Sequence, residues 1–192
     1  MTNETYNTPN PVAGDPKRED LKTPQGTTAD APTNDDVIST LNGLIETCKD
    51  GQEGFKQAAE GVERADLKKL FYEFSQQRAG YVGDLQSLVQ TLGGDPEKSG
   101  SIAGAVHRGW INIKSAVTGK DEGAILNECE RGEDSAKNAY KDALDMVLPV
   151  YIQQTLQTQY SGVQQAHDRV KALRDAANNE TDGKSTTART GF

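Results

Sequence analysis

The stretch DVISTLNGLIETCKDGQEGFKQAAEGV, residues 36–62, decides the fold of this chain. Its apolar side chains recur three or four residues apart, which is the spacing of one buried face on an α-helix. A capping cluster, Asn34-Asp35-Asp36, stands directly before it. The apolar positions are Val37, Leu41, Leu44, Ile45, Cys48, Phe55, Ala59 and Val62. We therefore predict a long amphipathic helix that needs partners to cover its apolar face.

Three more long regions, residues 67–92, 125–147 and 152–177, repeat this spacing. The link between the first two long helices is so short that they should be antiparallel neighbours. A shorter apolar stripe, Ile102 to Val117, would span about 25 Å as a helix, enough to carry the chain back along a bundle. No run alternates with a period of two, so we predict no sheet. Two antiparallel hairpins joined by one long crossover form the ferritin-like arrangement, and we predict an all-α, antiparallel four-helix bundle of this kind with a helical crossover.

The bundle should occupy residues 35–178, between two polar tails. Residues 1–34 hold five of the seven prolines and few large apolar side chains, and residues 179–192 are similarly polar. Such segments cannot bury enough apolar surface to offset the entropy lost on ordering, so we predict that both tails are disordered.

The composition excludes several classes of function. The balance of 29 acidic against 21 basic residues, a net charge of −8, argues against binding to nucleic acid. No apolar run approaches the roughly 20 residues of a membrane span, and the N-terminus lacks the parts of a secretory signal. We therefore expect a cytoplasmic protein that binds no membrane. Cys48 and Cys129 fall on apolar stripes without CxxC spacing, so we expect buried thiols rather than a redox pair.

Polar residues interrupt the four long stripes at about the same height. At 100° per residue they point within roughly 40° of the centres of the buried faces, and they fit within a layer about 12 Å deep. These residues are Gln52, Arg78, Glu133, Gln159 and His167. A buried arginine needs a carboxylate partner, and Glu133 is the one that the helix geometry offers.

Three interpretations of this polar layer remain open: a network that fixes helix register, a metal site, or a pocket for a small ligand. Di-iron bundles place a glutamate on each of two helices and Glu-x-x-His on the other two. Arg78 opposes divalent ions, so we favour the register network and expect no metal or cofactor, with iron or manganese as the alternative. The candidate metal ligands are Glu130, Glu133, Gln164 and His167. No Ser/His/Asp or Cys/His arrangement is present, so we expect no catalytic residues.

Five stretches and a helix start at Pro149 carry a family resemblance. The stretches are LNGLIETCKDGQEGFKQAAE (41–60), LKKLF (67–71) with QQR (76–78), GSIAGAVHRGW (100–110), ECERGED (128–134) and GVQQAHDRVKALRD (162–175). Together they resemble a bacterial family of ferritin-like four-helix bundles, domain of unknown function 2383. The resemblance covers roughly residues 35–178 and implies a compact bundle and an association with bacterial stress, but no reaction.

Of the ferritin ligand pattern, only Glu133 (or Glu130) and His167 match, whereas Gln52, Gln164 and Arg78 depart from it. We therefore expect a non-enzymatic, stress-associated bundle. The alternative is a metal-binding, di-iron-type oxidoreductase or an iron-handling protein. The crossover near Gly109 and Trp110 is where we would expect two copies to pair in a homodimer.

Overall fold

The computed structural model describes residues 32–96, 110 and 112–187, with side chains up to residue 179. Within these residues every regular element is an α-helix, which confirms the predicted all-α class. The helices are α1 (Asn34–Gly61), α2 (Ala65–Thr91), α4 (Ile113–Thr118), α5 (Glu122–Leu144) and α6 (Val150–Thr187).

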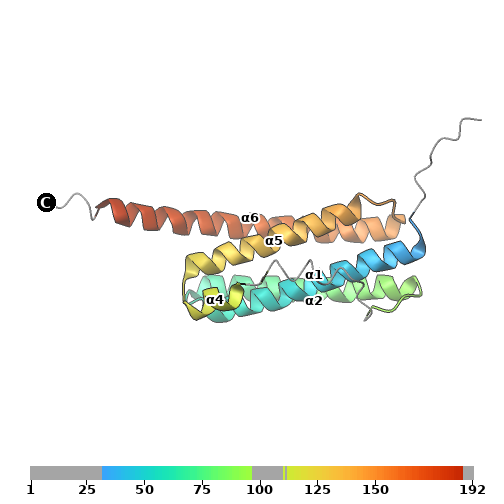
Figure 1. The fold of residues 1–192 in the computed structure, drawn as a ribbon, viewed down its shortest axis with the longest axis horizontal. Helices are drawn as coiled ribbons and strands as arrows, with labels where there is room; N and C mark the ends of the chain where they lie inside the picture. Colours follow the sequence, from blue (N-terminus) through green and yellow to red (C-terminus); the bar gives the residue numbers. More distant parts are fainter. Residues whose placement is uncertain (1–31, 97–109, 111, 188–192) are drawn as a thin grey trace, which may run out of the picture. The chain divides into compact units, whose positions relative to one another are not determined.

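The four long helices form two hairpins, α1 with α2 and α5 with α6, as Figure 1 shows. The short helix α4 packs against α1 and α5, and its Val117 fills the space where residue Gly61 has no side chain. At the same end of the bundle, Arg64 pairs with Glu122 at the start of α5. The chain has therefore returned from the far end of α2 before α5 begins, which is the predicted ferritin-like topology.

Sequence signals fix the ends of the first hairpin. The Thr33 hydroxyl accepts a hydrogen bond from the N–H of Asp36, and the Asp36 carboxylate accepts one from the N–H of Thr33, which is a capping box at the start of α1. After α2, Gly93 adopts a φ of +78°, which a residue with a side chain rarely takes. The N–H of Gly94 then donates to the carbonyl of Val89 and closes the helix end.

The apolar core consists of two clusters along the bundle. One includes Leu41 and Leu85 and lies toward the start of α1. The other includes Phe55 and Phe71 and lies toward the turn between α1 and α2. Every apolar residue predicted on the buried face of the first helix is buried. The spacing of the apolar side chains therefore identified correctly which apolar residues of α1 are buried.

The structure corrects two predicted helix ends. α6 continues to Thr187, beyond residue 178, because residues 179–187 contain one glycine and no proline to stop it. Val147, predicted in the core, is 74% exposed, because α5 ends at Leu144. Residues 1–31, most of the predicted N-terminal tail, and residues 188–192, the last part of the predicted C-terminal tail, lie outside the described part of the chain.

The predicted crossover helix over residues 102–117 is described only in part. α4 begins at Ile113, so Trp110 precedes it, and residues 97–109 lie outside the described part of the chain. A Cβ atom on Gly54 would lie 2.1 Å from the Trp110 ring, and one on Gly132 would lie 2.3 Å from it. Two glycines thus make a seat for this ring between α1 and α5. Trp110 is partly buried there, and pairing of two copies near this residue stays a prediction.

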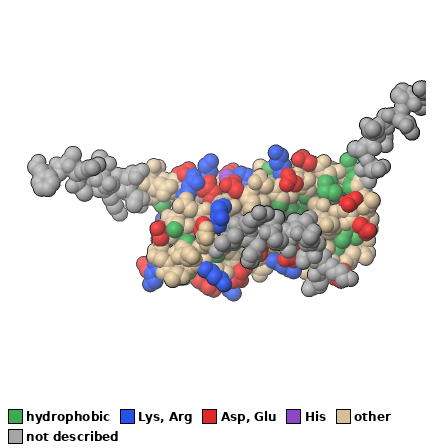
Figure 2. Space-filling model, in the orientation of Figure 1, with side chains coloured by type: hydrophobic (Ala, Val, Ile, Leu, Met, Phe, Trp, Pro, Cys, Tyr) green, Lys and Arg blue, Asp and Glu red, His purple; other side chains and the backbone are tan. Residues whose placement is uncertain are grey.

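The described surface is polar and mixed in charge. In the view of Figure 2, Asp and Glu side chains are interspersed with Lys and Arg rather than separated from them. Among the helices in the described ranges, none has the length and apolar character that crossing a membrane requires.

Candidate functional site

An ion pair occupies the centre of the bundle, between the two apolar clusters. Arg78 on α2 donates from Nη2 to Oε2 of Glu133 on α5 over 2.6 Å, and each side chain is 1% exposed. The guanidinium lies over two rings, 5.9 Å from the centroid of Phe55 and 5.5 Å from that of Tyr81. Such cation–π contacts offset part of the lost hydration of the charge. Gly51 on α1 lies beside the arginine, and a Cβ there would be at ordinary contact distance, 3.4 Å from Cγ of Arg78.

The two charges depend on each other. Burial raises the pKa of Glu133, and the charge of Arg78 acts against that rise. Burial acts to lower the pKa of Arg78, but the attraction of Glu133 and the hydrogen bond to it, with smaller contributions from Cys48 and Tyr140, together hold that pKa above its usual value. Arg78 Nη1 donates to Gln77 over 2.7 Å, whereas Arg78 Nε and Glu133 Oε1 have no hydrogen-bond partner within the described residues. The pair is therefore tightly coupled but incompletely hydrogen-bonded.

Gln159 on α6 is buried in a different group. Its Oε1 accepts from the hydroxyl of Tyr140 over 2.8 Å, and its Nε2 donates to the exposed Asp84 over 3.2 Å. The Tyr140 hydroxyl also lies 3.2 Å from Sγ of Cys48. These contacts form a polar chain from the surface into the apolar cluster near the start of α1. Gln159 therefore hydrogen-bonds to Tyr140 rather than to the central ion pair.

His167 on α6 is buried at the edge between α5 and α6. Its Nε2 lies 3.1 Å from Oδ1 of Asp134, and its Nδ1 lies 2.9 Å from Oδ1 of Asp168. Glu130, one turn before Asp134 on α5, accepts a hydrogen bond from Arg174. Ligand atoms of Glu130, Asp134 and His167 lie within 4.8 Å of one another. The residues predicted for one layer thus belong to three separate groups. These are the central pair Arg78–Glu133, the polar chain around Tyr140, and an edge group made of Glu130, Asp134 and His167.

Gln52 is exposed, so its predicted place in the buried polar layer is wrong. Gln164, named as a candidate metal ligand, is exposed as well. The phase of the first helix was taken from apolar side chains alone, and Gly51 and Gly54, which are buried, carry none. Including them turns the buried face toward Gly51 and away from Gln52. Only the backbone carbonyl of Gln52 serves the core, where it accepts from Ser75 over 2.8 Å.

Asp134 is not among the residues predicted for the site. Its side chain is 55% exposed and lies off the buried face of α5, but it still reaches His167. The available signal was its position four residues after Glu130, which places both carboxylates on one face of α5.

A ferritin-like di-iron centre does not fit these residues. Such a centre needs about four carboxylates and two histidines turned toward the bundle axis. Of the described residues, α1 presents Gly51 to the centre, α2 presents Arg78 and α5 presents Glu133. His167 turns to carboxylates at the edge. One carboxylate and a guanidinium cannot balance two divalent ions.

Both cysteines are buried, as their positions predicted, and their thiols should be inert. Burial raises the pKa of Cys48 to about 11 although a hydrogen bond with Tyr140 acts against it, and burial raises the pKa of Cys129 well above its usual value. Because the thiolate is the nucleophile, we expect neither residue to react with iodoacetamide at pH 8 in the folded protein. Intact mass should show two added groups only in denaturant. Rapid labelling of the folded protein would contradict this expectation.

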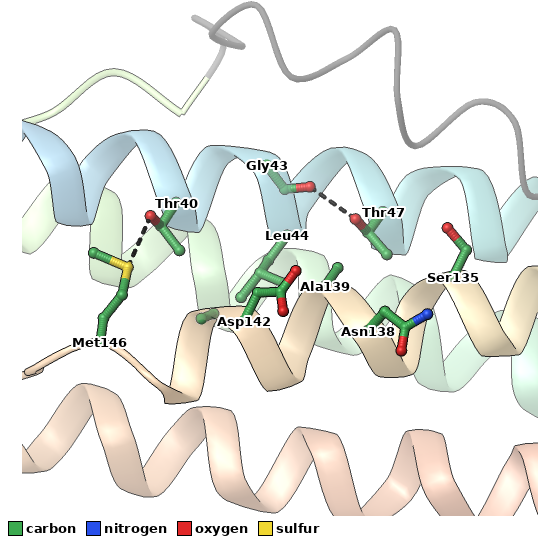
Figure 3. Close-up of a pocket in the computed structure, with 10 residues that line it drawn as sticks. Thr40, Gly43, Leu44, Thr47, Ser135, Asn138, Ala139, Asp142 and Met146 are labelled. Atoms are coloured by element: carbon green, nitrogen blue, oxygen red, sulfur yellow. Dashed lines mark hydrogen bonds between the residues drawn. The ribbon is translucent and has the colours of Figure 1, made fainter.

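A cleft of about 380 Å³ lies between α1 and α5, and Figure 3 shows the side chains around it. Its lining contains no member of the central ion pair. The hydroxyl of Thr47 donates to the carbonyl of Gly43 over 2.9 Å, and that of Thr40 lies 3.2 Å from the sulfur of Met146. Asp142 is the only titratable side chain that lines it in the described part of the chain. The cleft is therefore large enough for a small ligand, but its lining offers few groups that could recognise one.

Comparisons with known proteins place the chain in a family. No curated protein sequence matches it. A similar solved structure is a two-domain protein from Anabaena variabilis ATCC 29413 containing DJ-1/ThiJ/PfpI-like and ferritin-like domains, with a TM-score of 0.63 and 16% identity over 77% of this chain and 41% of that chain. At this identity the similarity shows the ferritin-like fold alone, and the present chain spans less than half of that protein. A family model described as Domain of unknown function (DUF2383) matches residues 36–146, more than half of the chain, and the chain therefore belongs to this family.

Proposed function

We propose that this protein is a non-enzymatic ferritin-like bundle in which the Arg78–Glu133 ion pair takes the place of a metal centre. The observation that carries the proposal is the buried guanidinium of Arg78 in the centre of the bundle. At an effective dielectric of about 20, a charge about 5 Å from a divalent ion costs roughly 6 to 7 kcal/mol. That is most of the roughly 8 kcal/mol that a micromolar site supplies.

The ion pair supports a structural role instead. A slip of α2 against α5 by one turn, about 5.4 Å, would separate the two charges inside the core. Each charge would then lack compensation, so the pair favours one axial register. A bundle fixed in this way acts through its surface, as a structural or interaction protein. The resemblance adds to this proposal a role in bacterial stress. We also propose a place in the cytoplasm, as expected from the composition.

The alternative function, a metal-binding oxidoreductase or iron-handling protein, has one observation in its favour. Glu130, Asp134 and His167 bring three ligand atoms within 4.8 Å of one another. That group lies at the edge of the bundle and offers ligands for one ion, whereas ferritin-type oxidation of iron uses a pair of ions within the bundle. We therefore keep the non-enzymatic function as the main proposal.

Iron oxidation separates the two functions. The purified protein should not raise the rate of Fe(II) oxidation by oxygen above that of buffer, followed by the ultraviolet absorbance of Fe(III). Rapid oxidation over many turnovers that Glu133→Ala abolishes would overturn the proposal. The Arg78→Glu variant removes the opposing charge and adds a carboxylate, so it provides a matched comparison. Iron binding that appears only in this variant would support a metal centre that a side chain has replaced.

A further inference from the structure

The edge group of α5 and α6 has the parts of a metal site that the central ion pair lacks. Glu130 and Asp134 are four residues apart on α5, so their carboxylates lie on one face of the helix. His167 reaches the same point from α6. Glu130 is 8% exposed and His167 is 6% exposed, so packing restricts both side chains, while the more exposed Asp134 leaves one side of the group open to water.

Asp168 prepares the histidine for this role. Its carboxylate lies 2.9 Å from Nδ1 of His167, a distance that requires the proton on Nδ1. In that tautomer Nε2 carries a lone pair and lies 3.1 Å from Oδ1 of Asp134, a second acceptor, so a cation between the two atoms would stabilise both. A carboxylate behind a metal-binding imidazole fixes the tautomer and the ring orientation and increases the basicity of the ligand nitrogen.

A cation already lies against these acceptors. Nζ of Lys137 is 3.3 Å from Nε2 of His167 and 3.7 Å from Oδ1 of Asp134. Its side chain is partly exposed, so it can swing into water when another cation arrives. Arg174, which contacts Glu130, also pairs with Asp175 and keeps that partner if Glu130 turns away. Both basic residues compete with a metal ion, and they mark the place as one that stabilises positive charge.

From this geometry we propose that Glu130, Asp134 and His167 bind a single first-row divalent metal ion, for which zinc fits best. Zinc accepts imidazole and carboxylate ligands in a tetrahedron with water at the open position. Bonds of about 2.0 to 2.1 Å place tetrahedral ligands about 3.3 Å apart. The present separations, up to 4.8 Å, therefore need to close by small side-chain rotations. The site uses neither Arg78 nor Glu133, so it stands or fails independently of the proposed function.

Calorimetric titration of the full chain, free of any affinity tag, with zinc chloride tests this site. We expect one equivalent to bind. Asp134→Asn, at an exposed position where folding should be unaffected, should weaken binding about tenfold or more, and Asp168→Asn should weaken it about 10- to 100-fold through the imidazole. Lys137→Gln removes the competing cation and should tighten binding by roughly tenfold.

Two control variants make the result specific. Asp142→Asn makes the same change of charge two turns further along α5, and it should leave the zinc affinity within about twofold of the parent because charges at that distance are screened. His107→Gln removes the other histidine of the chain and should also leave it unchanged. Thermal melts of each variant without metal would establish that it folds. Absence of saturable binding by the parent chain, or equal affinities for the parent, Asp134→Asn and Lys137→Gln, would overturn the proposal.

Discussion

Glu133→Gln is expected to lower the free energy of unfolding by about 3 to 5 kcal/mol, which is the cost of leaving one buried charge without its partner. Arg78 would keep its charge at a position where its side chain is 1% exposed. Urea denaturation of the parent and the variant measures the difference. Glu73→Gln is the matched control, because it makes the same chemical change at an exposed position on α2 and should alter stability by less than about 0.5 kcal/mol.

Replacing both partners should restore much of this loss. In Arg78→Met/Glu133→Leu no charge remains in the core, and the atoms Arg78 Nε and Glu133 Oε1, which lack hydrogen-bond partners among the described residues, are removed as well. Apolar replacements for buried ion pairs are often neutral or stabilising. Equal stability of Glu133→Gln and the parent would contradict the buried pair, and a double variant less stable than Glu133→Gln would show that the pair stabilises the bundle strongly.

Gly54→Ala is expected to destabilise the protein by about 1 to 3 kcal/mol, the usual effect of overfilling a packed site. The new methyl group would lie 2.1 Å from the ring of Trp110, which would have to leave its seat and its edge-on contact with Phe55. Trp110 is the only tryptophan of the chain, so its fluorescence emission should shift toward that of a hydrated ring as stability falls. Gly132→Ala should act in the same way from the opposite helix, at 2.3 Å.

Gly80→Ala is the matched control for these changes. It makes the same substitution inside α2, where no atom lies within 4 Å of the new Cβ. Because alanine favours a helix over glycine by about 0.5 to 1 kcal/mol, this variant should gain stability by that amount. A gain in stability of the same size in Gly54→Ala, with unchanged tryptophan emission, would show that the space around Trp110 accommodates the methyl group without loss of stability.

The fold could be predicted because large apolar side chains report the phase of each long helix. Leu41, Leu85 and Leu156 all lie in one buried cluster, as their spacing implied. Arg78 and Glu133 were identified in the same way, as polar residues on otherwise apolar faces. Where the buried face is formed by glycine, this signal fails, and the position of Gln52 was wrong for that reason.

The edge group could not be predicted from helix phase. Asp134 points away from the axis, and its contact with His167 depends on how closely α5 and α6 approach. The seat of Trp110 was hidden for a related reason. Gly54 and Gly132 leave space for the Trp110 ring because they have no side chains. A pattern of apolar and polar side chains does not reveal such a space.

The central ion pair also limits how this chain can evolve. A single change that removes the charge of Arg78 or Glu133 leaves the other charge buried without its partner, so each such one-step path leads through a less stable protein. That cost is a large fraction of the 5 to 15 kcal/mol that typically holds a domain together. An evolutionary step between this ion pair and a metal-binding centre, in either direction, would therefore require two substitutions in close succession. Otherwise it would require a protein stable enough to tolerate the first one alone.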